Sequence, residues 1–257
     1  MPTIDAHDPG TICWIDLSST DAAGAAEFYC DLFGWTAAEP IENAGGYRML
    51  LHGGRNVAGL APVWGDTDRS SWSTYVASAD ADATCAAAVR NGGEVVMDAM
   101  DVLDAGRMAV LRDPDGAQVS VWQAGLHQGC EVQGEPGAPI WSELVTRDAA
   151  GARLFYGEVF GWSAEEQEFG GVPYMVWKRG GQLVGAALEM DDSWPEATHP
   201  HWLVSIATSD CDGTARRCLQ LGGSVRQPPS DIGQGRCALL EDPSGAAFSI
   251  VALRGSS

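Results

Sequence analysis

In the first 34 residues, the hydrophobic and polar positions follow the spacing of a strand and then that of a helix. Residues 11–18 read as a strand that is buried on one side. The side chains that this strand would place together on one face are Ile12, Trp14, Asp16 and Ser18. Asp21 is typical of a helix N-cap, apolar residues then recur at helical spacing as far as Phe33, and Gly34 is a typical helix stop. The pattern therefore predicts a strand followed by a helix.

A predicted hairpin over 47–51 and 56–60 completes this first unit. The same order then begins again, with a strand over 72–78, a helix over 81–90, and strands near Val95, over 108–112 and over 118–123. Asp80 would cap the second helix, and Gly92-Gly93 would end it. The predicted unit is strand–helix–strand–strand–strand, with two such units in this half.

The second half of the chain repeats the first. Residues 21–25, Asp-Ala-Ala-Gly-Ala, recur unchanged as residues 148–152, at an offset of 127. Other matching blocks are Phe28-Tyr29 with Phe155-Tyr156, Phe33-Gly34-Trp35 with Phe160-Gly161-Trp162, and Asp113-Pro-Asp-Gly-Ala117 with Asp242-Pro-Ser-Gly-Ala246, the last at an offset of 129. A period of this length predicts two complete domains, and the drift of two residues fits insertions in surface loops.

We therefore predict one domain over residues 8–125 and another over residues 139–254. The polar segment 126–138, which contains glycine and proline, is predicted to be the linker. The elements predicted in the second domain are strands over 140–145, 202–207, 237–240 and 247–251, a hairpin over 174–177 and 183–188, and helices that Asp148 and Asp210 cap and that run to Phe160 and Leu221.

The charge of the chain limits its partners. Of 257 residues, 35 are Asp or Glu and 15 are Lys or Arg, which gives a net charge of −20. Such a chain repels phosphate groups, so we expect neither nucleic acid nor an anionic membrane as a partner. The acidic surface indicates either simple solubility or a preference for cationic ligands. We expect a monomer or a homodimer.

The cysteines and the N-terminal sequence bear on location. The seven cysteines are an odd number without CxxC spacing, and the first-half cysteines have no counterpart at the repeat-equivalent positions. Reduced thiols in the cytoplasm fit this pattern best. The first residues, Met-Pro-Thr-Ile-Asp, lack the basic and apolar regions of a signal peptide, and no apolar run is long enough to cross a bilayer.

The ordered set of motifs resembles the vicinal oxygen chelate superfamily, which includes glyoxalases, bleomycin-resistance proteins and extradiol dioxygenases. The motifs that carry the resemblance are an Asp-capped helix with Phe-Tyr-x3-Phe-Gly-Trp, Gly-Gly after the second helix, and Asp-Pro-x-Gly before the last strand, each present twice. The resemblance implies an α+β fold of two tandem domains, each with two βαβββ modules whose curved mixed sheets enclose a cavity.

The resemblance also implies metal ligands that this sequence lacks. Metal-using members carry His or Gln seven residues before the capping Asp, where this chain has Trp14 and Trp141. They carry Glu four residues after the Gly of Asp-Pro-x-Gly, where this chain has Ser120 and Ser249. An indole nitrogen only donates hydrogen bonds and cannot bind a cation through a lone pair. We therefore expect neither a metal nor another cofactor.

Two acidic residues lie beside the tryptophans that replace the metal ligands. Strand alternation places Asp16 on the face of Trp14, and Glu143 on the face of Trp141. Each carboxylate would either pair with an arginine of its own sheet, for which Arg107 and Arg236 are the candidates, or bind a ligand or act as a general acid or base. These two acids are the candidate catalytic residues.

Aromatic and polar residues complete the predicted site. The strand tryptophans are either core residues or an aromatic cage for a flat or cationic ligand, and His201 is either a surface residue or the edge of a pocket. The residues expected to bind a ligand are Trp14, Trp72, Trp122, Ser120, Arg107, Trp141, Tyr174, Ser249, Arg236 and His201.

The sequence thus favours a metal-independent protein that binds a hydrophobic or aromatic small molecule, such as a metabolite or an antibiotic, for sequestration or for secondary metabolism. The alternative is an enzyme on the same scaffold, an isomerase, cyclase or hydroxylase that uses Asp16 or Glu143 as acid or base. A metal-dependent lyase or dioxygenase would need ligands from positions that the motifs do not predict.

Overall fold

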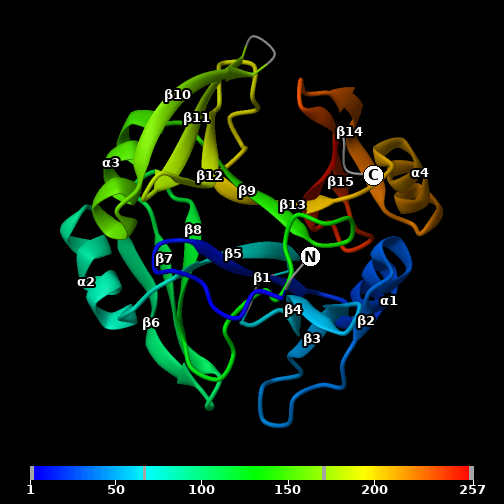
Figure 1. The fold of residues 1–257 in the computed structure, drawn as a ribbon, viewed down its shortest axis with the longest axis horizontal. Coiled ribbons are helices and arrows are strands. Elements are labelled where there is room, and N and C mark those ends of the chain that lie inside the picture. The colour runs from blue at the N-terminus through cyan, green and yellow to red at the C-terminus, as the bar shows by residue number, and fades with distance from the viewer. Residues whose placement is uncertain (1–2, 66–67, 170–171, 255–257) are drawn as a thin grey trace.

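A computed structural model describes residues 3–65, 68–169 and 172–254 (Figure 1). The unit strand–helix–strand–strand–strand occurs four times, as the repeat predicted. The first domain contains β1 (Ile12–Ser19), α1 (Ala22–Phe33), β2 (Thr36–Ala37), β3 (Arg48–His52), β4 (Arg55–Pro62), β5 (Ser71–Ala77), α2 (Ala81–Arg90), β6 (Glu94–Val102), β7 (Gly106–Arg112) and β8 (Gln118–Ala124). The second contains β9 (Pro139–Thr146), α3 (Ala149–Phe160), β10 (Ser163–Phe169), β11 (Val172–Arg179), β12 (Gln182–Glu189), β13 (His201–Ala207), α4 (Cys211–Gln220), β14 (Ser224–Asp231), β15 (Gly235–Glu241) and β16 (Ala247–Leu253).

Each domain forms one open, mixed sheet of eight strands. The strand order is β2-β3-β4-β1-β5-β8-β7-β6 in the first domain and β10-β11-β12-β9-β13-β16-β15-β14 in the second. In both sheets the two central strands, β1 with β5 and β9 with β13, are antiparallel to each other and each is parallel to its outer neighbour. The α+β class and the tandem arrangement of open sheets agree with the prediction.

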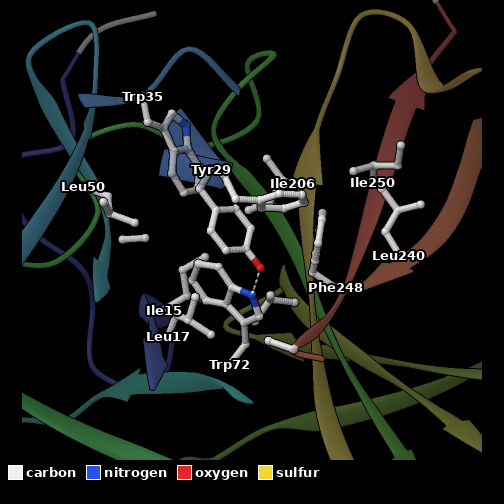
Figure 2. Close-up of a cluster of buried hydrophobic side chains, with 14 of the residues drawn as sticks. Ile15, Leu17, Tyr29, Trp35, Leu50, Trp72, Ile206, Leu240, Phe248 and Ile250 are labelled. Atoms are coloured by element: carbon white, nitrogen blue, oxygen red, sulfur yellow. Dashed lines mark hydrogen bonds between the residues drawn. The ribbon is translucent and has the colours of Figure 1, made fainter. Parts of the chain in front are cut away.

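Each half of one domain packs against a half of the other domain. Helix α1 lies next to α4, and α2 lies next to α3, so each half-domain packs against a half of the other domain (Figure 1). One hydrophobic core joins residues of β1 and α1 to residues of β13, α4 and β16, among them Ile15, Tyr29, Ile206 and Phe248 (Figure 2). A second core joins α2, β7 and β8 to α3 and β11. The helices and these cores occupy the space between the sheets.

The repeated Phe-Tyr and Asp-Pro-x-Gly motifs meet across this interface. Tyr29 accepts a hydrogen bond from the Trp72 indole at 3.0 Å (Figure 2) and donates one to Asp242 of the other domain at 3.2 Å. The other pair repeats this arrangement, because Tyr156 accepts from Trp202 at 3.0 Å and donates to Asp113 at 3.0 Å. The motifs that reveal the duplication therefore hold the two copies together.

The predicted helix caps are confirmed. All four capping aspartates accept a hydrogen bond from a backbone N–H in the first turn of the helix, and they are Asp21, Asp80, Asp148 and Asp210. Gly34 ends α1 in a left-handed conformation with φ of 69°, which glycine adopts without strain.

Two features differ from the prediction, and a third concerns the segment predicted to be the linker. The pattern missed β2, β10 and β14, of which β2 has two residues and β14 contains Pro228 and Pro229 at a sheet edge, where proline is tolerated. A register shift in β1 between Ile12 and Trp14 turns Ile12 toward the interdomain core, away from the face of Trp14. The predicted linker is packed, with Cys130 and Val132 both 1% exposed.

Two further findings concern the chain as a whole. All seven cysteines are free thiols, as their spacing predicted. Among the helices in the described part of the chain, none is both long and apolar enough to cross a membrane.

Candidate functional site

One face of the first sheet points away from the helices and carries the predicted acid. Trp14 and Asp16 project from β1 on this face, and the Trp14 indole donates a hydrogen bond to the Tyr47 hydroxyl at 2.9 Å. The Tyr75 hydroxyl, from β5, donates to Asp16 Oδ2 at 2.7 Å. The result is a carboxyl group enclosed by two phenols and an indole.

Burial governs the acidity of Asp16. Desolvation raises the pKa of this carboxyl from its usual 3.8 to about 6, although hydrogen bonds from Tyr75 and Ser73 work in the opposite direction. No arginine or lysine forms an ion pair with Asp16 or Glu143 within residues 3–65, 68–169 and 172–254. An inward carboxyl without a basic partner is costly to keep charged.

The chain itself covers this face of the first domain. Trp14, Tyr75 and Trp122 are 3%, 6% and 6% exposed, and they form a hydrophobic cluster with Cys130 of the connecting segment. The ring of His127, from the same segment, packs edge-on against Trp14 with the ring centres 4.5 Å apart. Its backbone carbonyl accepts a hydrogen bond from the Trp122 indole at 2.9 Å.

The corresponding face of the second domain holds a related set of side chains. The Trp141 indole donates to the Tyr174 hydroxyl at 3.1 Å, and that hydroxyl donates in turn to Glu143 Oε2. Burial raises the pKa of Glu143, and the bond from Tyr174 lowers it in part. All three residues are half-buried, so this face is more open than that of the first domain.

A single glycine accounts for the different placement of the two tyrosines. Gly59 lies beside Asp16 in the sheet, and a Cβ at this position would collide with the Tyr47 hydroxyl and lie 2.9 Å from the Asp16 Cβ. Ala186 takes the same place beside Glu143 and carries that Cβ. The position that the Tyr47 hydroxyl occupies is therefore closed in the second domain, and the Tyr174 hydroxyl lies against the carboxyl group.

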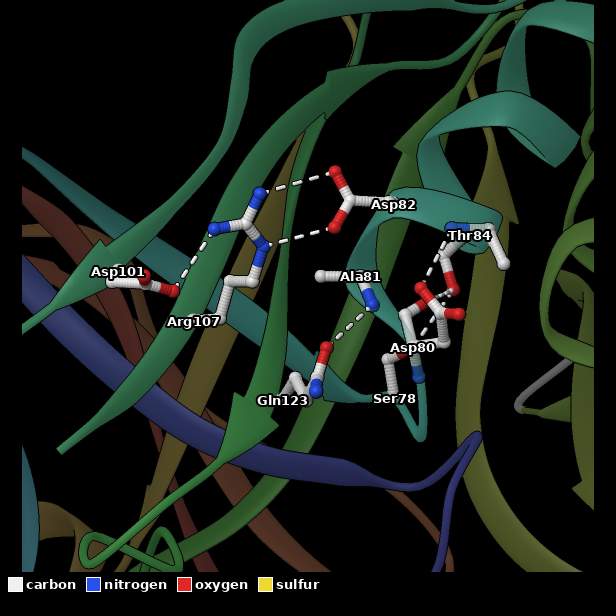
Figure 3. Close-up of polar contacts among 9 residues, drawn as sticks. Ser78, Asp80, Ala81, Asp82, Thr84, Asp101, Arg107 and Gln123 are labelled. Carbon is white, nitrogen blue, oxygen red and sulfur yellow. Dashed lines mark hydrogen bonds and ion pairs between the residues drawn. The ribbon is translucent and has the colours of Figure 1, made fainter. Parts of the chain in front are cut away.

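Three of the residues predicted to bind ligand lie elsewhere. Trp72 is on the helix-covered face, in the interdomain core, where it bonds to Tyr29. Arg107 pairs with Asp82 of α2 at 2.9 Å and with Asp101 of β6 at 2.9 Å, on the helix-covered side of the sheet (Figure 3).

Arg236 repeats the Arg107 arrangement with Asp212 and Asp231. The expectation that either arginine pairs with Asp16 or Glu143 is therefore wrong, because both arginines bind aspartates of the helices α2 and α4 on the helix-covered side of the sheets.

The remaining predicted residues lie on the open faces. Ser120 hydrogen-bonds to the Tyr75 hydroxyl, and the Ser249 hydroxyl donates to the Ala238 carbonyl at 3.2 Å. His201 is half-buried at the start of β13, and its Nδ1 lies 2.9 Å from the carbonyl oxygen of His199.

Sequence reasoning missed Tyr47, Tyr75 and His127. The repeat offset could have found Tyr47, because 174 − 47 is 127, the offset of the strand and helix that precede it. Tyr75 has no tyrosine counterpart, since Ser205 takes its place in β13, and His127 lies in the segment predicted to be a linker. No pattern within the sequence marks these two.

The donor set does not fit a metal ion of the kind that the resemblance implied. In the described residues there is no group of three or more His, Cys, Asp and Glu side chains placed to hold a metal. Trp14 and Trp141 stand at the positions expected for metal ligands, and the N–H of each indole donates a hydrogen bond to a tyrosine hydroxyl.

Two open sheets of paired βαβββ units define the class of this protein. The chain belongs to the glyoxalase/bleomycin resistance protein/dioxygenase superfamily, whose model matches residues 11–121 and 127–250.

Curated relatives cover almost the whole chain. It is 42% identical to the anthracycline biosynthesis protein DnrV of Streptomyces peucetius over 96% of this chain and 94% of that one. It is 39% identical to the putative glyoxylase CFP32 of Mycobacterium bovis over 98% of both chains. The Mn(II)-bound glyoxalase from Novosphingobium aromaticivorans has a similar fold, with a TM-score of 0.66 and 15% identity over 96% of this chain and 83% of that one.

Proposed function

We propose that this protein binds a hydrophobic, aromatic small molecule on a helix-free sheet face, without a metal, and that it handles this molecule in secondary metabolism or sequesters it. The observation that carries the proposal is the pairing of an indole and a phenol with an enclosed carboxyl group in both domains. Aromatic rings supply contact area for a flat ligand, and a few convergent polar groups fix its orientation.

Metal independence rests on the chemistry of the side chains. A hard divalent cation prefers carboxylate and imidazole ligands held in fixed geometry, and the positions that would supply them carry indoles and serines. Elemental analysis of the purified protein tests this part of the proposal directly. A stoichiometric divalent ion that survives dialysis against a chelator would contradict it.

The proposed class of ligand draws on the relatives. The relative named for anthracycline biosynthesis spans almost all of this chain, which supports a fused-ring aromatic metabolite as the ligand. An antibiotic is one such molecule, and the acidic surface, with its net charge of −20, would favour a ligand that carries a cationic group. The seven free thiols support action in the cytoplasm.

A second candidate function is catalysis of a metal-free isomerisation, cyclisation or hydroxylation. The pKa of Asp16, raised by burial to about 6, favours it, because an acid or base works best when its pKa lies near the working pH. Glu143 is the corresponding candidate in the second domain, and its pKa is also raised by burial.

A titration with planar aromatic compounds tests the proposal. We expect saturable quenching of tryptophan fluorescence by fused-ring compounds, and weaker quenching in Trp141→Phe, because one of the ten tryptophans would then no longer report. Unchanged fluorescence and unchanged melting temperature with every compound would refute the binding function. Asp16→Asn and Glu143→Gln separate the two candidates: a catalyst loses turnover while binding persists, whereas a binder shows no turnover to lose.

A further inference from the structure

The first domain already contains a phenol bound to its enclosed carboxyl group. The Tyr75 hydroxyl donates to Asp16 Oδ2 at 2.7 Å, and the Tyr75 ring lies beside Trp14 in the sheet. Trp122 closes the same hydrophobic cluster, and the connecting segment covers it. An aromatic alcohol of the chain itself thus occupies this face.

The second domain lacks both of these rings. Ser205 pairs with Trp141 in the sheet just as Tyr75 pairs with Trp14. Val251 stands where Trp122 stands, since each lies two residues beyond the serine that pairs with the neighbouring parallel strand. One phenol ring and most of one indole are therefore missing, and the hydrophobic cluster of the first domain has no counterpart here among the described residues.

The acid on this face keeps an unused acceptor. Tyr174 donates to Glu143 Oε2, and within residues 3–65, 68–169 and 172–254 no donor reaches the other oxygen, Oε1. A carboxylate can accept about four hydrogen bonds, so a donor from outside the chain can still bind to this group. Asp16, by contrast, receives bonds from both Tyr75 and Ser73.

We propose that the second domain binds a planar arene that bears a phenolic hydroxyl, with the hydroxyl donating to Glu143 Oε1 and the ring lying beside Trp141 in the place that Tyr75 takes in the first domain. The chain would bind one such molecule, because the first domain fills its own site. This inference rests on the function proposed above and names the class of ligand and the domain that binds it.

A phenol fits this site better than a cation does. The model for the contact is the neutral phenol of Tyr75, bound between an indole and a carboxyl group. The carboxyl of Glu143 is surrounded by Trp141, Tyr174, Leu203 and Cys237, which carry no positive charge, and burial disfavours its charged form. A neutral donor can satisfy the acceptor without requiring a hydrated ion to enter.

Calorimetric titration with 2-naphthol and with 2-methoxynaphthalene tests the inference. These two compounds differ in the hydroxyl that the site should recognise. We expect one 2-naphthol per chain, bound at least about tenfold more tightly than the ether, which is 1.4 kcal/mol. In Glu143→Gln the preference for the hydroxyl should fall to about twofold or less, whereas Glu158→Gln, an exposed change of the same kind on α3, should retain it.

A second variant tests the place of the ligand. Ser205→Tyr recreates in β13 the phenol of the first domain, and we expect it to abolish 2-naphthol binding, with retention of fold checked by circular dichroism and thermal unfolding. If this folded variant binds as the wild type does, the placement is wrong. Two molecules per chain would also overturn the assignment to one domain.

The outcomes separate this inference from the broader function. Equal affinity for the hydroxyl compound and its ether, or an unaltered preference in Glu143→Gln, overturns the phenol contact but leaves aromatic binding intact. If a cationic arene such as 1-naphthylmethylammonium binds and 2-naphthol does not, the class of ligand is wrong. If no planar arene binds, the proposed function fails, and this inference fails with it.

Discussion

The raised pKa of Asp16 predicts a specific dependence of stability on pH. The pKa is about 6 in the folded protein and 3.8 for an exposed aspartate, so the folded state holds the proton to a higher pH than the unfolded chain does. Ionisation of Asp16 therefore disfavours the folded state. Its cost is absent below about pH 3.8, grows as the pH rises, and levels off above about pH 6, where it reaches about 3 kcal/mol at 1.36 kcal/mol per pH unit.

Asp16→Asn removes this titration and leaves an oxygen that can accept the bond from Tyr75. Two-state proton linkage with these pKa values gives a cost of about 2 kcal/mol at pH 5 and about 3 kcal/mol at pH 8. The free energy of unfolding of the variant relative to the wild type should therefore rise by about 1 kcal/mol between pH 5 and pH 8.

Urea denaturation of both proteins at pH 5, 6, 7 and 8 measures this difference. Groups that titrate equally in both proteins, Glu143 among them, cancel in the comparison. We keep to pH 5 and above because a strongly acidic chain loses its net charge and its solubility at lower pH. A difference between the two proteins that stays constant over this range would refute the reasoning, whatever its size.

Other predictions concern packing and assembly. Tyr29→Phe removes the interdomain hydrogen bond to Asp242 and should lower the free energy of unfolding, measured with urea, by about 1–3 kcal/mol. A decrease of less than about 0.5 kcal/mol would show that this hydrogen bond contributes little. Gly59→Ala adds a methyl group against the Tyr47 hydroxyl and should cost about 1–3 kcal/mol, with a changed near-ultraviolet circular dichroism spectrum; an unchanged spectrum would contradict the close contact. Asp21→Ala removes the N-cap of α1 and should cost about 1 kcal/mol, whereas Asp21→Ser should restore most of it.

The helices and the acids could be predicted because local signals determine them. An Asp cap, apolar spacing and a following glycine act within a few residues, and alternation alone places Asp16 beside Trp14. Alternation does not tell which of two faces a helix will cover. The pattern therefore does not reveal that Trp72, which we expected to bind a ligand, lies in the core.

Contacts between distant segments account for the other differences. The shift in β1 that turns Ile12 toward the other domain depends on how β1 pairs with β5, and nothing within residues 11–18 signals it. The connecting segment looks like a linker in composition, yet Cys130 donates to the Val57 carbonyl at 3.1 Å and is buried. Such packing depends on the assembled sheet, so composition alone does not reveal it.

Residues that are identical in the two domains and residues that differ between them lie in different parts of the molecule. The motifs that occur in both domains, such as Phe-Tyr and Asp-Pro-x-Gly, lie where the two domains contact each other. A substitution in one of these motifs must therefore remain compatible with the residues that it contacts in the other domain. The open faces carry no such constraint, and there Tyr75 and Ser205 have diverged while an acid is present in both copies. The first copy therefore covers its face with its own aromatic side chains, whereas we propose that the face of the second copy binds a ligand of the same chemistry.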